Sequence, residues 1–250
     1  MSTKLQVECV LRSALPASTI FANELLLRLP RIEIQIMRSK LELVALPLHT
    51  VLNGAGKRIE YGYFINSGMA SILTVLKSGK MVEVGLSGAE GFVGLPLVAG
   101  LKSSGGRVIV QAAGSAFRIS AGEVAKALGR CPVLERRLHR YTHEVSAQAA
   151  QIAACNRLHN SRQRLARWLL MSQDRMKGES VRLTQEMLAH MLGMRRASVS
   201  VALTQLHRAG MVSYARGKTE IVDRARLEAA SCECYSAINE GRRVWSRESR

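Results

Sequence analysis

The alternation of apolar and polar positions is most regular in the C-terminal third of the chain, over residues 183–221. Apolar residues recur there at helical spacing after Thr184, whose hydroxyl suits a helix N-cap, and Gly193 follows as a residue that reaches left-handed dihedrals at little steric cost. A second helix is predicted over residues 195–207, followed by a short hairpin. The pattern predicts a helix-turn-helix with a β-hairpin wing, a unit that places its second helix in the major groove of DNA.

Between residues 44 and 119 the pattern changes to short apolar or β-branched runs separated by turn residues. The predicted strands are residues 61–65, 70–76, 81–86 and 108–112. The breaks between the runs are rich in Gly, Asn and Ser, as in Asn66-Ser67-Gly68, and these residues favour tight turns. Several short strands at near-regular spacing predict a β-sandwich or a barrel-like roll.

Helical periodicity flanks this β region. Residues 1–40 predict short helices, and residues 121–128 predict another helix that Gly129 ends. A long helix is predicted over residues 132–156, where apolar positions alternate in spacings of four and three, as in the seam of a two-stranded coiled coil. The predicted dimer seam is Leu134, Leu138, Tyr141, Val145, Gln148 and Ile152. The alternative is a helix that packs the same stripe on its own domain.

The pattern divides the chain into four parts and predicts the α+β class. Residues 1–130 are predicted to form a β-roll domain with flanking helices, and residues 131–157 a dimerisation helix. Residues 158–228 are a winged helix-turn-helix that includes an amphipathic helix over 160–176. Residues 229–250 carry four arginines and little apolar pattern, which predicts a loose basic tail.

Composition narrows the class of protein. The 250 residues are 47% hydrophobic and 22% charged, which is typical of a globular protein. The formal net charge of +17 is spread over the whole chain and favours a polyanionic partner such as double-stranded DNA. No apolar run reaches the length of a membrane helix, and the N-terminus lacks the pattern of a signal peptide. Five scattered cysteines predict no disulfide framework, so a cytoplasmic location is expected.

Two pairs of residues have the chemistry of metal ligands. Cys232 and Cys234 form a Cys-x-Cys, and Cys155 and His159 lie one helical turn apart. Thiolates and imidazoles bind zinc well. Because the pairs are far apart in the sequence, the expectation is a buried Cys155, incidental tail thiols and no metal site.

The sequence contains no catalytic signature. There is no phosphate-binding loop ending in Gly-Lys-Ser/Thr and no Gly-x-Ser-x-Gly, and no nucleophile is placed beside a base in a known spacing. The chain is therefore not expected to be an enzyme. The alternative in a different class is a small-molecule-binding module, or an enzyme, with an incidentally basic surface.

A β-roll, a long helix and a terminal winged helix in this order resemble the Crp/Fnr superfamily of bacterial transcription regulators. The resemblance covers residues 20–228, and its strongest motifs are Tyr63-Phe64-Ile65-Asn66-Ser67-Gly68 and the segment 183–206. It implies a homodimer that binds a two-fold symmetric DNA operator and responds to a signal sensed in the roll. It also leaves RNA polymerase open as a further partner.

Family members that bind cyclic nucleotides carry a Gly-Glu pair and then an Arg followed by Ser or Thr. The resemblance maps this effector pocket onto Gly94, Leu95, Arg107 and Val108. Leu95 cannot accept a bond from a ribose hydroxyl, and leaving that hydroxyl unpaired costs about 1–3 kcal/mol. We therefore expect a degenerate sensor of unknown ligand and no established cofactor, with a cyclic-nucleotide-dependent activator as the alternative.

The same resemblance implies how DNA is contacted. Arg196 matches an arginine at the start of the family's second helix, where it can bond guanine O6 and N7. Ala197 replaces a glutamate, and Val201 replaces a later arginine and suits a thymine methyl group. The predicted DNA-binding residues are Thr184, Gln185, Arg195, Arg196, Ser198, Ser200, Val201, Arg216 and Lys218.

Overall fold

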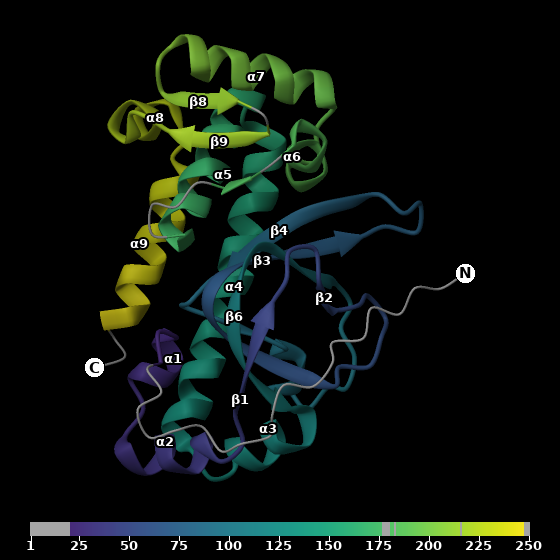
Figure 1. Cartoon of the computed structure of the whole chain (residues 1–250), viewed down its shortest axis with the longest axis vertical. Helices are drawn as coiled ribbons and strands as arrows, with labels where there is room; N and C mark the ends of the chain where they lie inside the picture. The colour runs from purple at the N-terminus through teal and green to yellow at the C-terminus, as the bar shows by residue number, and fades with distance from the viewer. Residues whose placement is uncertain (1–20, 177–180, 183, 216, 248–250) are drawn as a thin grey trace.

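The computed structural model describes residues 21–176, 181–182, 184–215 and 217–247. They form an elongated molecule with a β-roll and its flanking helices at one end and a mainly helical domain with a small sheet at the other (Figure 1). A long helix leads from the first part toward the second. This is the α+β arrangement that the sequence predicts.

The N-terminal part consists of two short helices, one antiparallel sheet and a short 3-10 turn. In chain order its elements are α1 (Glu24–Leu27), α2 (Arg31–Arg38), β1 (Glu42–Leu46), β2 (Val51–Asn53), β3 (Tyr61–Val75), β4 (Met81–Ser87), β5 (Phe92–Val93), η1 (Leu95–Leu97) and β6 (Arg107–Ser120). The strand order is β1-β6-β3-β4, and β2 also pairs with β6 and β5 with β3. Because β3 and β6 pair along most of their length, they form the centre of the roll.

β3 is one long strand where the sequence predicts two. The Asn66-Ser67-Gly68 segment, predicted as a turn, lies inside β3 at shifts in its pairing with β6. Gly68 has φ +82°, and a Cβ on it would lie 2.6 Å from the carbonyl oxygen of Ala112. The prediction was wrong because glycine permits a bulge as readily as a turn, and bulges let a long strand bend around a roll.

The helices that follow the roll lie close to their predicted bounds. α3 spans Ala121–Leu128, and the hydroxyl of Ser120 caps it by accepting a hydrogen bond from the amide of Glu123. α4 spans Pro132–Leu158 and begins with a proline, whose missing amide is not needed in a first turn. No helix within the described ranges is long and apolar enough to cross a membrane.

The apolar stripe of α4 packs on the chain's own β-roll. Leu134, Leu138 and Tyr141 are at most 4% exposed and belong to the core of the roll. Gln148 accepts a hydrogen bond from the amide of Leu86 in β4 at 3.0 Å. A four–three spacing does not distinguish a partner helix from a sheet, because both bury one stripe of a helix. The predicted seam is therefore wrong for all six of its side chains, which face inward: Leu134, Leu138, Tyr141, Val145, Gln148 and Ile152.

The C-terminal domain contains the predicted helix-turn-helix and hairpin, together with a short strand and a helix that were not predicted. Its elements are α5 (Ser161–Met176), β7 (Val181–Arg182), α6 (Gln185–Leu192), α7 (Arg196–Arg208), β8 (Val212–Ala215), β9 (Lys218–Ile221) and α8 (Arg224–Ala230). The strands pair in the order β7-β9-β8. Trp168, Leu188, Val199 and Leu206 are each at most 1% exposed and form one core from α5, α6 and α7.

A final helix, α9 (Cys234–Arg247), replaces the predicted loose tail. It lies along α4 (Figure 1), and Tyr235 and Ile238 contact a small apolar cluster formed by the roll, α4 and α5. Arg242 reaches Glu24 of α1 at 3.5 Å. The tail prediction was wrong because the segment is polar on average, although its few apolar residues recur at helical spacing and form a short stripe that faces inward.

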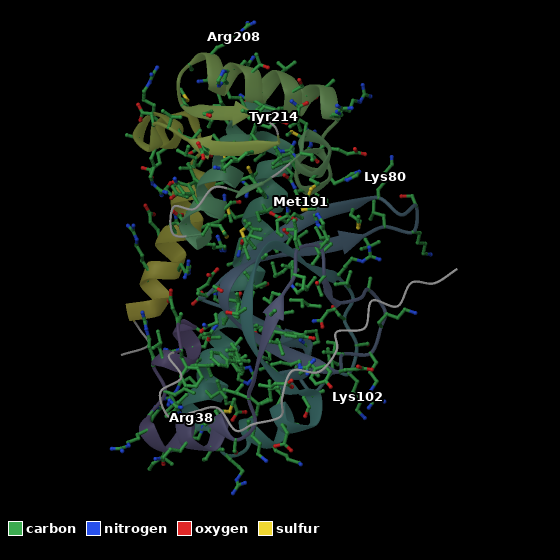
Figure 2. All side chains as sticks on the ribbon, in the orientation of Figure 1. Arg38, Lys80, Lys102, Met191, Arg208 and Tyr214 are labelled. Carbon is green, nitrogen blue, oxygen red and sulfur yellow. The ribbon has the colours of Figure 1, made fainter. Side chains whose placement is uncertain are left out.

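The β-roll and the C-terminal domain are in direct contact. Glu83 of β4 is 3% exposed and accepts hydrogen bonds from Trp168 Nε1 of α5 at 2.8 Å and from Ser71 Oγ at 2.6 Å. Leu73 of β3 joins the core of the C-terminal domain, and Figure 2 shows Met191 of α6 beside the same β3–β4 hairpin. Burial raises the pKa of Glu83 to about 7, although the two hydrogen bonds and nearby arginines oppose the shift.

We predict that Glu83→Gln makes the protein more stable above pH 7 and changes little near pH 4.5. The folded carboxyl holds its proton up to about pH 7, whereas the unfolded one loses it from about pH 4.5. Native stability therefore falls as pH rises between these values, by an amount on the order of 1–3 kcal/mol. Urea unfolding at pH 5 and pH 8 measures it, with the exposed Glu60→Gln as the control. The same difference from wild type at both pH values would contradict a protonated Glu83.

Candidate nucleic-acid interface

The turn between α6 and α7 is fixed by local interactions. Thr184 Oγ1 accepts a hydrogen bond from the amide of Met187 at 3.2 Å, so Thr184 is the predicted N-cap of α6. Gly193 ends α6 with φ +57°. A Cβ on Gly193 would lie 3.0 Å from Val82 Cγ2 of β4, so the turn rests on the β-roll. These contacts hold α7 at the far end of the molecule with its inner face on the core.

The outer face of α7 is open to solvent. Arg195, Arg196 and Ala197 are exposed at its start, and Val201 is 59% exposed. Ser198 and Ser200, which were also predicted to bind DNA, lie on the flanks of this face and are half-buried. Val201 therefore presents its methyl groups to solvent between the exposed ends of this face.

Arg208 belongs to the same outer face and is absent from the sequence prediction. It lies seven residues after Val201, so both point the same way from α7, and Figure 2 shows Arg208 projecting from the end of the domain. Its place at the last residue of the helix hides it from a motif comparison. The α-helical period alone would have indicated it.

Of the two DNA-binding residues predicted in the wing, the structure describes Lys218. Lys218 begins β9 and forms a 2.6 Å ion pair with Glu220 at the surface. Arg216 lies outside the described residues. At the start of α6, Thr184 is exposed and Gln185 half-buried, where amides at a helix N-terminus favour phosphate.

The structure does not gather the predicted effector pocket. Gly94 lies against Gly62 near the start of β3, and Leu95 packs on the core of the roll. Arg107 pairs with Leu73 near the other end of β3 and donates to Met81 Sδ at 3.7 Å. Val108 is buried within a separate apolar cluster. The predicted set of Gly94, Leu95, Arg107 and Val108 is therefore wrong as a single site.

A polar cavity of about 330 Å³ lies elsewhere, between α4, α5 and α9. Glu90 and Arg175 form a buried 2.8 Å ion pair at its edge, and burial raises the pKa of Glu144 to about 7. Arg242 of α9 lines it as well. Sequence reasoning missed this cavity because one of its walls is the helix predicted as a tail.

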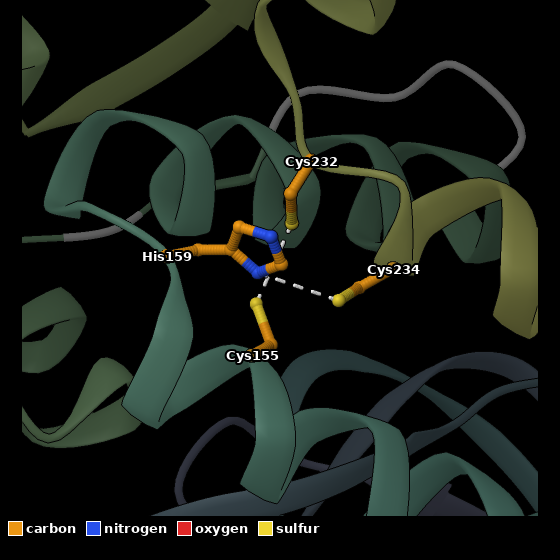
Figure 3. Close-up of side chains that lie close together, drawn as sticks. All are labelled: Cys155, His159, Cys232 and Cys234. Atoms are coloured by element: carbon orange, nitrogen blue, oxygen red, sulfur yellow. Dashed lines mark hydrogen bonds between the residues drawn. The ribbon is translucent and has the colours of Figure 1, made fainter.

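The two candidate metal-ligand pairs meet at the end of α4. Cys155, His159, Cys232 and Cys234 have ligand atoms that all lie within 4.8 Å of one another (Figure 3). The expectation of incidental tail thiols is wrong, because Cys232 and Cys234 are buried by the course of α8 and α9. A hydrogen bond from Cys232 lowers the pKa of Cys155 to about 5 and raises the pKa of Cys232 itself.

The C-terminal domain, with an exposed second helix and a short hairpin after it, has the form of a winged helix-turn-helix. Residues 163–230 match the family model of the Crp-like helix-turn-helix domain. A search of curated proteins gives no match.

Solved structures share the fold over about three quarters of this chain. FixK2 from Bradyrhizobium japonicum is 19% identical with a TM-score of 0.65, and the match covers 77% of this chain and 98% of that one. TTHB099, a CRP-family transcriptional regulator from Thermus thermophilus, is 20% identical (TM-score 0.61, coverage 75% and 96%). The c-di-GMP responsive regulator CLP of Xanthomonas campestris is 15% identical (TM-score 0.63, coverage 77% and 99%). The family model thus identifies a Crp-like helix-turn-helix domain in residues 163–230, and the solved structures show that the fold is shared over about three quarters of the chain.

We predict that Arg196→Ala weakens binding to a specific DNA site by about 1–3 kcal/mol and relaxes the preference at one base pair. The guanidinium is exposed at the start of α7, so its removal leaves the core intact. Fluorescence anisotropy measures the change on a duplex that carries the protein's preferred DNA site and on single-base variants of that duplex. The control is Arg226→Ala, an exposed arginine on α8. Equal losses on specific and random duplexes would show that Arg196 does not read a base.

Proposed function

We propose that this protein regulates transcription as a homodimer that binds a specific DNA sequence through α7. The observation that carries the proposal is the exposed outer face of α7, set opposite a packed core within the Crp-like region 163–230. The formal net charge of +17 supports the proposal, because phosphate neutralisation dominates DNA affinity. RNA polymerase is a further partner suggested by the family resemblance alone.

The proposed DNA contacts are of two kinds: residues that contact base edges and residues that bind the phosphate backbone. Arg196 donates to a guanine edge, and Val201 packs on a thymine methyl group. Thr184 and Gln185 bind phosphate at the N-terminus of α6, where the helix amides favour an anion. Ser198 and Ser200 adjust to neighbouring bases, while Arg195, Arg208, Arg216 and Lys218 bind the backbone.

The dimer uses the outer side of α4, because its inner side is occupied by the roll. Exposed residues on that side are spaced three and four apart, the repeat of a helix pair. They are His143, Ser146, Ala150, Ala153 and Arg157. Ser and Ala at the centre of this face let two helix backbones approach closely, which supports an α4–α4 contact between two copies.

The sensor differs from the cyclic-nucleotide pattern. Leu95 packs on the roll core, and Arg107 lies toward the other end of β3, so the pocket of the family's nucleotide-binding members is not assembled from them. We infer a different ligand, or a signal carried by another part of the roll. Calorimetry with cyclic AMP and cyclic GMP tests this inference, and micromolar binding would contradict it.

Selection of binding sites from random duplexes tests the proposal most directly. The expected result is a two-fold symmetric sequence with half-sites about 34–36 Å apart. Affinity should fall steeply with salt, because each phosphate contact releases counterions. Failure to enrich any sequence at moderate salt would favour a binding module with an incidentally basic surface.

We predict that the double substitution Ala150→Glu, Ala153→Glu converts the dimer to a monomer. Four like charges would meet across the contact, while each side chain stays in solvent within one chain. Sedimentation should show the change, and affinity for the full site should fall about 10²-fold or more as the second half-site contact is lost. Ala229→Glu on α8 is the control. A double variant that remains dimeric would place the interface elsewhere.

A further inference from the structure

The cluster of Cys155, His159, Cys232 and Cys234 has the dimensions of a mononuclear metal site. The two sulfurs of Cys155 and Cys232 are 3.5 Å apart, and Cys234 Sγ lies 3.5 Å from His159 Nδ1. Tetrahedral ligands at usual Zn–S and Zn–N lengths stand about 3.6–3.8 Å apart. A sulfur–sulfur distance of 3.5 Å is far beyond the ~2.05 Å of a disulfide.

The three sulfurs of the cluster are buried and separate from the apolar cores, and His159 is half-buried at its edge. Cys155, Cys232 and Cys234 are 0%, 3% and 1% exposed, and they contact one another as a group of their own. Cysteines that serve as small apolar side chains pack instead among aliphatic and aromatic residues, as Cys131 does in the core of the roll. Four protein ligands without an open position are the pattern of a structural zinc site.

Polar neighbours hold the ligands in place. Glu233 Oε2 lies 3.1 Å from His159 Nε2, which turns Nδ1 toward the three sulfurs (Figure 3). A carboxylate on the far nitrogen of a histidine is the usual second partner of a metal-bound imidazole. Gln151 donates from Nε2 to Cys234 Sγ at 3.1 Å, a bond that favours the thiolate.

The surrounding charge suits an anionic complex. Three thiolates and one neutral imidazole around Zn²⁺ carry a net charge of −1. Arg167 is 2% exposed, and its positive charge acts on Cys155. Its Nε has no hydrogen-bond partner among the described residues. A buried guanidinium in this position compensates the complex, since an isolated buried charge is costly.

We propose that Cys155, His159, Cys232 and Cys234 bind one zinc ion, which fastens the start of α9 to the end of α4. Zinc binding displaces the thiol protons into solvent, and each sulfur then donates an electron pair to the metal. The site lies at the passage from α4 to α5, where the roll meets the C-terminal domain. The metal therefore sets how α8 and α9 are held against the dimer helix.

Metal analysis of the full-length protein, purified without a polyhistidine tag, tests the proposal. The expected content is about one zinc per chain after dialysis. Replacement with Co²⁺ should give the visible and near-ultraviolet absorption of a tetrahedral thiolate complex. This measurement uses the unaltered chain, so it does not depend on whether a variant folds, and it is independent of DNA binding.

Two matched variants assign the ligands. Cys234→Ser should be purified without stoichiometric zinc, because one of the four ligands is lost, whereas Cys131→Ser, the same change at an equally buried thiol outside the cluster, should keep its zinc. A chelator should lower the melting temperature of wild type and of Cys131→Ser, but not of Cys234→Ser. A zinc-free protein that gains no Co²⁺ bands at micromolar metal would overturn the proposal. A Cys155–Cys232 disulfide, or the absorption of an iron–sulfur cluster, would overturn it too.

Discussion

One side of α4 is buried against the β-roll, and this contact determines which other sides of the helix can pack on α9 or contact a partner. Leu134, Leu138 and Tyr141 fill the core of the roll, so α4 cannot rotate to offer them to a partner. A second side is covered by α9, and the third remains open with its small residues. The last turn presents Cys155 to the segment that leads into α9. One packing contact thus separates the intramolecular, intermolecular and metal-binding functions proposed for a single helix.

Local signals in the sequence predicted the elements whose ends are fixed by neighbouring residues. α3 begins at Ala121 and is followed by Gly129 as expected, and Thr184 and Gly193 bound α6. Two predictions failed: the side of α4 that would face a partner helix, and the division of β3 into two strands. The spacing along α4 shows that a stripe is buried but does not show what covers it, and Gly68 is compatible with both a turn and a bulge.

The candidate sites also differ in how far the sequence could predict them. The exposed arginines of α7 follow from helical period and a family motif, and the structure leaves them open to solvent. The cysteine–histidine cluster could not be predicted, because it joins segments 77 residues apart and depends on the course of α8 and α9. Spacing within each pair indicated the chemistry, and only the tertiary fold showed that the pairs meet.

The contact between Gly193 and Val82 has a mechanical consequence. The turn that aims α7 rests on β4, and the clearance there is so small that even a methyl group would press on Val82. The turn before α7 therefore cannot move closer to β4 without displacing the Val82 side chain. A shift of β4 within the roll would therefore be passed directly to the turn that precedes α7, through the contact of Val82 with Gly193.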